Sequence, residues 1–116
     1  MIWLEMISVR AAGIIEAEKV LEICRQTYLS IAGEKLLNMT VFRNAKYATD
    51  ISILLHWKSN PGTGSILGKE LSAALEDFGL TIHTIWIKQE ELDTPKHVYK
   101  RPEFELTNSV AFVLVN

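Results

Sequence analysis

The order in which two hydrophobic periodicities follow one another is the feature that most constrains the fold of this chain. Short segments rich in β-branched and aromatic residues predict strands. Apolar residues at three- and four-residue steps predict amphipathic helices. We expect strands over residues 2–9, 36–42, 51–57 and 80–88, and helices over residues 14–31 and 66–78. This order predicts a ferredoxin-like α+β domain, βαββαβ, with a four-stranded antiparallel sheet and both helices on one face.

Both predicted helices carry an apolar stripe and a glycine at the expected end. Gly33 suits the left-handed C-terminal cap of the first helix, and Gly79 is expected to end the second. The stripe of the first helix comprises Ala17, Val20, Leu21, Cys24, Tyr28 and Ile31. The stripe of the second comprises Ile66, Leu67, Leu71, Ala74, Leu75 and Phe78. Because Cys24 lies on such a stripe, we expect a buried packing residue and not a reactive thiol.

The glycine-rich segment SNPGTGSILGKE, residues 59–70, does not fit a phosphate-binding loop. The Walker pattern G-x-x-x-x-G-K-[ST] places a hydroxyl on the metal ion. Here only three residues separate Gly64 from Gly68, and Glu70 stands where the hydroxyl is needed. The segment therefore predicts a strand-to-helix connection, with Ser65 as the N-cap that accepts a hydrogen bond from a free N–H of the first turn.

The predicted strands carry apolar residues on both faces of the sheet, although two helices can cover only one. Alternate residues from Ile51 to Trp57 share an apolar face, whereas Leu54 lies on the opposite face beside His56. The fourth strand also has large apolar residues on both faces: Ile82 and Trp86 on one, Ile85 and Ile87 on the other. Monomers rarely expose an apolar patch of this size. We therefore expect a homodimer through the sheet face.

The whole chain, residues 1–116, is expected to form a single ferredoxin-like domain. Residues 90–103 contain two prolines and many charged side chains, which predicts a linker. Residues 109–115 are almost entirely apolar, which predicts an extra strand at the C-terminus.

Composition argues against several classes of partner. A net charge of −2 gives no general attraction to nucleic acid or to an anionic membrane. No apolar run reaches the roughly 20 residues that span a bilayer. The segment MIWLEMISVR lacks the basic start and the cleavage site of a signal peptide. The single cysteine cannot form an internal disulfide. We expect a cytoplasmic protein with no nucleic-acid or membrane partner.

The βαββαβ order, the two-sided strands and the trailing C-terminal strand resemble the dimeric α+β barrel superfamily. That group includes the antibiotic-biosynthesis monooxygenase-like and stress-responsive barrel domains, and the resemblance covers residues 2–88 plus the terminal strand. It implies two sheets facing each other across a dimer, and a small organic ligand in a cleft beside each sheet. Haem-degrading relatives use an asparagine on the first strand. None occurs in residues 2–10, so that activity is not implied, and no catalytic residue of the family can be transferred by position.

Three residues are the candidates for catalysis. His56 and His83 fall on the two strands that flank the first strand of such a sheet, and imidazole is the usual proton carrier near neutral pH. If both face the same side, they could border one pocket with Glu5 between them as an acid or base. A metal site is not expected, because the chain has no H-x-x-x-H or C-x-x-C spacing. No cofactor is indicated.

Two functions stay open from the residues alone. One is a monooxygenase-like enzyme acting on a small organic substrate in a cleft beside the sheet. The alternative is a non-catalytic ligand-sensing or regulatory module. RNA binding is not favoured, although RNA-recognition domains share this order of elements. Their third strand carries a pattern of exposed aromatic residues that ISILLHWK lacks.

Overall fold

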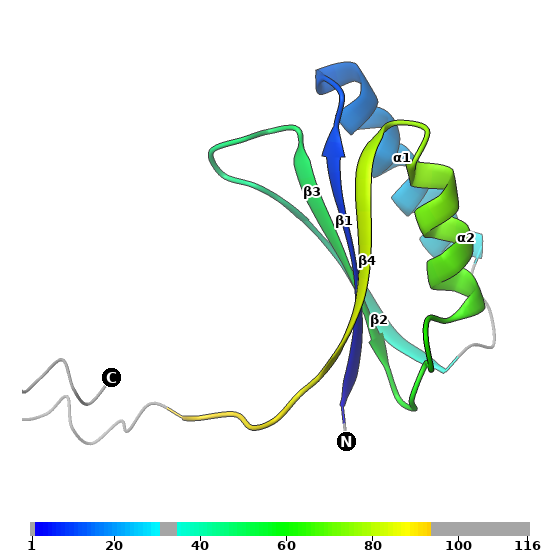
Figure 1. Ribbon diagram of the computed structural model, residues 1–116, viewed down its shortest axis with the longest axis vertical. Coiled ribbons are helices and arrows are strands. Elements are labelled where there is room, and N and C mark those ends of the chain that lie inside the picture. The colour runs from blue at the N-terminus through cyan, green and yellow to red at the C-terminus, as the bar shows by residue number, and fades with distance from the viewer. Residues whose placement is uncertain (1, 31–34, 94–116) are drawn as a thin grey trace, which may run out of the picture.

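The computed structural model describes residues 2–30 and 35–93. These residues form a four-stranded antiparallel sheet of order β2–β3–β1–β4, with two helices on one face (Figure 1). The elements are β1 (Trp3–Ala11), α1 (Ile14–Ser30), β2 (Leu36–Arg43), β3 (Asp50–Trp57), α2 (Ile66–Leu75) and β4 (Gly79–Ile87). The predicted ferredoxin-like arrangement is confirmed.

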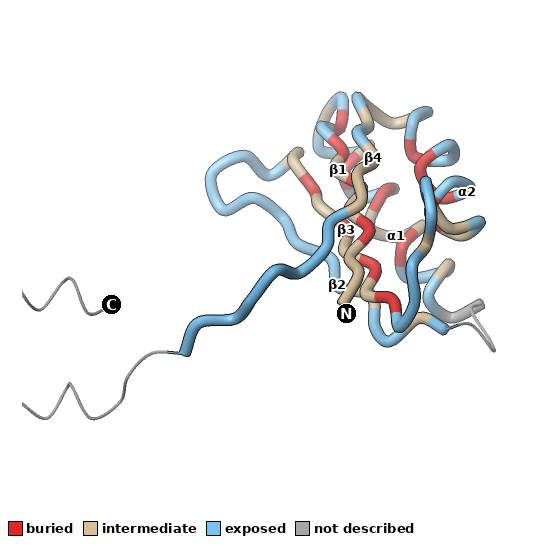
Figure 2. The backbone as a smooth tube through the Cα atoms, turned by 60° about the horizontal axis from the view of Figure 1, so that its bottom comes forward, coloured by how far each residue is buried: buried red, intermediate tan, exposed pale blue. Residues whose placement is uncertain are grey.

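The core lies between the sheet and the helices, and β1 and β3 contribute most to it. Strict alternation buries every second residue of β3, from Ile51 to Trp57, as the sequence predicted. Full burial of a side chain such as Ile7 or Ile53 stabilises the fold by about 1.5–3 kcal/mol. In contrast, β2 and its connection to β3 are largely exposed (Figure 2). The buried apolar residues are Ile7, Val9, Ala11, Ala17, Val20, Cys24, Ile51, Ile53, Leu55, Trp57, Leu71 and Leu75.

The apolar stripes of the helices are narrower than predicted. Ala17, Val20 and Cys24 are buried on α1, but Tyr28 is exposed. Tyr28 lies near the end of the helix, at the edge of the packed core. On α2 the prediction was wrong for Ile66, which is exposed. A helix turns about 100° per residue, so Ile66 points almost opposite to the buried residues of α2, which are Gly68, Leu71, Ser72 and Leu75.

Gly79 does not end α2, contrary to the prediction. The helix ends at Leu75, and Glu76 forms its C-cap in ordinary right-handed geometry. Gly79 is instead the first residue of β4, where a Cβ atom would lie 2.1 Å from the carbonyl oxygen of Arg10. This glycine is required for the close approach of β4 to β1.

Several predicted features fall on residues that the structure does not describe. Ile31 and the Gly33 cap are among them, as are residues 94–103 of the linker and the strand over residues 109–115. Residues 90–93 are exposed and have no regular secondary structure. The single-domain organisation of the full chain stays a prediction. Within the described residues, no helix is both long and apolar enough to cross a membrane.

Candidate functional site

A buried carboxylate, Glu5, lies on the helix side of β1. It has no solvent exposure. Its Oε1 accepts hydrogen bonds from the Trp57 indole nitrogen at 2.8 Å and from the Ser65 hydroxyl at 2.6 Å. Its Oε2 accepts from the Ser65 backbone N–H at 3.0 Å and lies 2.6 Å from His83 Nε2. A carboxylate has about four acceptor positions, so these four contacts use its full capacity and offset the cost of burying its charge.

Two glycines leave the space that this carboxylate occupies. A Cβ atom on Gly68, in the first turn of α2, would lie 2.0 Å from Glu5 Oε2. A Cβ atom on Gly64 would lie 2.7 Å from His83 Cε1, and the φ angle of Gly64 is +143°, a conformation that other residues rarely adopt. The glycine cluster therefore makes room for the Glu5 carboxylate, which accepts hydrogen bonds from Ser65 at the start of α2. It is the strand-to-helix connection that was predicted, and Ser65 is the predicted N-cap, accepting a hydrogen bond from the Gly68 N–H at 2.8 Å.

His83 reaches Glu5 from the edge strand β4. Its side chain is 19% exposed. Glu5 Oε1 already accepts two hydrogen bonds and Oε2 accepts one from the Ser65 N–H, so we assign the hydrogen of the short contact to His83 Nε2. In the neutral imidazole the other nitrogen, Nδ1, then carries the lone pair. Among the described residues, none forms a hydrogen bond with Nδ1, and this atom is not sealed from solvent.

His56 lies on the opposite face of the sheet from Glu5 and His83. It pairs with Leu4 and Asn38, one residue out of phase with the buried residues of β3. The expectation that both histidines border one pocket is therefore wrong, because the alternation of β3 directs His56 away from the helices. Its Nδ1 lies 3.4 Å from the Asn38 amide nitrogen, whereas its Nε2 is buried and has no hydrogen-bond partner among the described residues.

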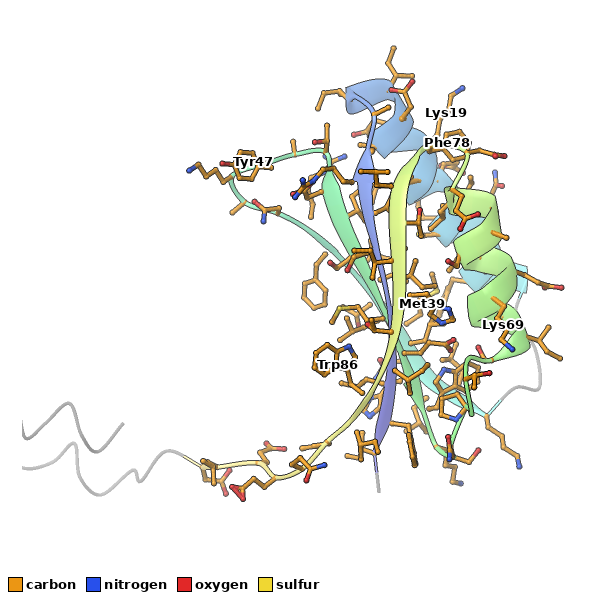
Figure 3. All side chains as sticks on the ribbon, in the orientation of Figure 1. Lys19, Met39, Tyr47, Lys69, Phe78 and Trp86 are labelled. Carbon is orange, nitrogen blue, oxygen red and sulfur yellow. The ribbon has the colours of Figure 1, made fainter. Side chains whose placement is uncertain are left out.

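The face that carries His56 is not covered by either helix, and we call it the open face. Phe42, Ile82 and Trp86 are all more than half exposed on it, and Trp86 projects from the sheet on the side away from the helices (Figure 3). A depression of about 470 Å³ lies near the β2–β3 connection, between Phe42 and Ile82. Strand pairing places these residues on the open face: Leu4, Met6, Ser8, Asn38, Thr40, Phe42, Ser52, Leu54, His56, Ile82, Thr84 and Trp86.

A second cavity lies on the helix side, between α1 and the edge strand β2. We call it the α1–β2 groove; its volume is about 430 Å³. Its walls are mainly apolar, and its polar side chains are Arg25 and Tyr28. Asn38 also borders the groove, but its amide contacts His56 on the open face. It forms because α1 covers the centre of the sheet and leaves much of β2 uncovered. The lining residues are Leu21, Cys24, Arg25, Tyr28, Leu37, Asn38, Met39 and Val41.

Neither a metal site nor a reactive thiol is part of this arrangement. In the described part of the chain, no three His, Cys, Asp or Glu side chains lie close enough to hold a metal ion. Burial raises the pKa of the Cys24 thiol from 9.0 to about 11. The thiol therefore stays protonated at neutral pH, as expected of a packing residue.

No protein-family model matches the sequence, and neither does any curated protein. Solved structures do match. ActVA-Orf6 from Streptomyces coelicolor, a monooxygenase solved with nanaomycin D, gives a TM-score of 0.56 at 12% identity, over 78% of this chain and 89% of its own. SnoaB from Streptomyces nogalater, a cofactor-independent oxygenase, gives a TM-score of 0.55 at 12% identity; the match covers 78% of this chain and 96% of SnoaB. A conserved protein from Methanosarcina mazei Go1 gives a TM-score of 0.62 at 14% identity; the match covers 77% of this chain and 94% of that protein.

The chain has the fold of the antibiotic-biosynthesis monooxygenase-like proteins. The resemblance predicted from the order of elements is confirmed at the level of fold. Because one such fold hosts many activities, the function of this chain has to be argued from its own residues.

Sequence reasoning found Glu5 and His83 but missed what surrounds them. The role of Trp57 as a donor was not predicted, although a tryptophan on the buried face of β3 needs an acceptor for its indole N–H. Gly68 was correctly predicted to lie in the second helix, but the space that it leaves for the Glu5 carboxylate was not predicted. The α1–β2 groove had no signal in the sequence, because it depends on where α1 packs across the sheet.

Proposed function

We propose that this monooxygenase-like domain binds a small organic molecule in the α1–β2 groove. The observation that carries the proposal is the groove itself. A volume of about 430 Å³, apolar walls and few polar groups are typical of small-molecule sites. One protein of the same fold, ActVA-Orf6, was solved in complex with nanaomycin D, which supports a ligand of comparable kind.

The lining residues indicate what such a ligand should look like. Leu37, Met39 and Val41 provide a flat apolar wall from one strand, suited to an aromatic or fused-ring body. Tyr28 offers a hydroxyl at the groove, whereas the Asn38 amide contacts His56 on the open face. The Arg25 guanidinium is already paired with Glu22, at 3.1 Å, so the groove does not require an anionic ligand. We expect a largely apolar ring system with a carbonyl or hydroxyl substituent.

We further propose that the protein works as a homodimer, with a second copy covering the open face. The support is the cluster of exposed large side chains on a face that neither helix covers. The α1–β2 groove lies on the other side of the sheet, so dimerisation through the open face leaves it accessible.

Binding without chemistry is the function that the groove supports best. Its described lining includes no histidine and no carboxylate, so it offers no general base to a bound substrate. A monooxygenase-like enzymatic activity is the second candidate. The observation that favours it is the oriented Glu5–His83 pair, which lies outside the groove.

The test is an NMR titration of isotope-labelled protein with nanaomycin D and a panel of aromatic ketones and phenols. We expect chemical-shift changes at the groove residues of β2 and α1. The variant Leu37→Trp should fill the groove and raise the dissociation constant of the ligand at least about tenfold. The matched control is Ile15→Trp, which places the same side chain on an exposed part of α1 away from the groove. Shifts confined to the open face, or equal weakening by both variants, would contradict the proposal.

A further inference from the structure

We propose that the depression on the open face is a second small-molecule site, which takes a neutral planar lactam, a ring with a C=O and an N–H group side by side. Its volume of about 470 Å³ is that of a ligand pocket. The depression lies on the opposite side of the sheet from the α1–β2 groove, and the residues that form it belong to one copy of the chain. The inference therefore depends neither on ligand binding in the groove nor on the homodimer.

Two serines create the depression. Strand pairing aligns four residues in one row across all four strands of the sheet, in the order Ile82, Ser8, Ser52 and Phe42. The two side chains at the centre of the row are short, whereas Ile82 and Phe42 are large and more than half exposed. Because side chains of one row stand next to one another on the same face, short central residues leave a hollow between the large outer ones.

The hollow is confined to one end of the open face. In the adjacent row towards the start of β1, the central positions carry Met6 and Leu54, which pair directly, and the depression does not extend over them. At the other end, the β2–β3 connection projects from the sheet on the side away from the helices (Figure 1). Asn44, the first residue of that connection, lines the depression.

The floor of the depression is polar. Ser8 Oγ lies 3.3 Å from Ser52 Oγ, and either atom can be the donor of this hydrogen bond. Each hydroxyl has one hydrogen, and their contact uses only one of the two. The pair therefore keeps one O–H that can donate to a ligand, which suits a carbonyl oxygen.

An ion pair beside the serines determines the charge of the ligand. Arg10 Nε lies 3.3 Å from Asp50 Oδ1, and both residues line the depression. Within the described part of the chain, the Arg10 Nη groups and Asp50 Oδ2 have no other hydrogen-bond partner. Since the pair is neutral as a whole, an anionic ligand would meet the like charge of Asp50 and a cationic ligand that of Arg10. A neutral ligand avoids both costs.

The order of donors and acceptors favours a lactam among neutral ligands. Arg10 only donates and Asp50 only accepts, and the two residues are direct neighbours on β1 and β3. A lactam matches this pattern, because its C=O accepts from the guanidinium or a serine hydroxyl while its N–H donates to Asp50. The exposed ring of Phe42 offers a flat surface for stacking, and Ile82 provides the apolar wall on the other side.

The test is an NMR titration of the full isotope-labelled chain with carbostyril, a neutral bicyclic lactam. We expect saturable chemical-shift changes at Ser8, Ser52 and Ile82. N-methylcarbostyril cannot donate a hydrogen bond to Asp50 and should bind at least about tenfold more weakly. Benzoate and free phenylalanine, which are charged, should also bind more weakly than carbostyril.

A pair of variants tests the position of the site. Ser52→Leu should fill the hollow and raise the dissociation constant of carbostyril at least about tenfold. The matched control is Thr40→Leu, which also replaces a hydroxyl side chain on the open face but lies outside the depression, and it should leave the constant unchanged. If Ser52→Leu does not fold, the comparison of carbostyril with its N-methyl derivative decides the matter on the unaltered chain.

Three results would overturn the proposal. One is an absence of carbostyril binding, or shifts confined to the α1–β2 groove, which would leave ligand binding in the groove intact. Another is equal or tighter binding of N-methylcarbostyril, benzoate or phenylalanine, which would exclude a lactam as the preferred ligand. The third is an equal effect of Ser52→Leu and Thr40→Leu on carbostyril binding by folded proteins.

Discussion

His83 Nε2 lies 2.6 Å from Glu5 Oε2, although 78 positions separate the two residues in the sequence. β1 and β4 are adjacent antiparallel strands, and their register places His83 beside Ile7, two residues along from Glu5 on the same face. The contact joins the central strand, the edge strand and, through Ser65, the start of α2. It is a structural connection whether or not the pair also carries out chemistry.

The first prediction concerns Gly68, which leaves space for the Glu5 carboxylate. Gly68→Ala should lower the free energy of unfolding by about 2–3 kcal/mol, because the new methyl group would overlap the buried Glu5 carboxylate. Urea denaturation measures this. The matched control is Gly13→Ala, whose Cβ would meet only the movable end of the Glu16 side chain, at 2.9 Å. Equal losses for the two variants would contradict the account of Gly68.

The second prediction concerns assembly through the open face. Ile82→Asp should convert the expected homodimer to a monomer, because a carboxylate would be buried without a partner in the interface. Ile15→Asp, on the exposed surface of α1, should leave the dimer intact. Sedimentation velocity at micromolar concentration measures both. A monomeric wild-type protein would show instead that another part of the chain, such as residues 109–115, covers the open face.

The order of elements was predictable from the sequence because each periodicity extends over a whole element. The face of His56 was predictable too. Ile51, Ile53, Leu55 and Trp57 form the apolar face of β3, so the residue between the last two must point away from the helices. The sheet face on which His83 lies was not predictable, because β4 carries apolar residues on both faces.

Other features depended on packing that no local pattern encodes. The α1–β2 groove results from the position of α1 and from an irregular register between Leu36 and Asn38 at the start of β2. The start of α2 was predicted correctly, but Ile66 was assigned to the apolar stripe although it points almost opposite to the buried residues of the helix.

The third prediction concerns the unpaired nitrogen of His56. His56→Leu should raise the free energy of unfolding by about 1 kcal/mol, since it removes a buried polar atom that has no hydrogen-bond partner in the described part of the chain. The Asn38 amide loses a contact but is exposed and can bind water. Thermal and urea denaturation would show the change. A clear loss of stability would mean that His56 makes an interaction absent from the described chain, for example across a dimer interface.

The fourth prediction follows from the Cys24 thiol, whose pKa burial raises to about 11. Above pH 9 the thiol ionises in the unfolded chain but stays protonated in the folded one, so stability is lost as the pH rises from 9 towards 11. The loss should approach about 1.4 kcal/mol per pH unit in that window. Cys24→Ala should lack this component when urea denaturation is compared at pH 8 and pH 10. Identical pH dependence of the two proteins would contradict burial of the thiol.

The central claim is that this domain binds a small organic molecule on the helix side of its sheet. The most direct test is a crystal structure of the protein soaked with nanaomycin D and with the aromatic ketones and phenols. The account predicts ligand density in the α1–β2 groove, against Leu37 and Met39 and within hydrogen-bonding reach of Tyr28. Ligand density only on the open face, or a groove closed by the protein's own residues, would contradict it.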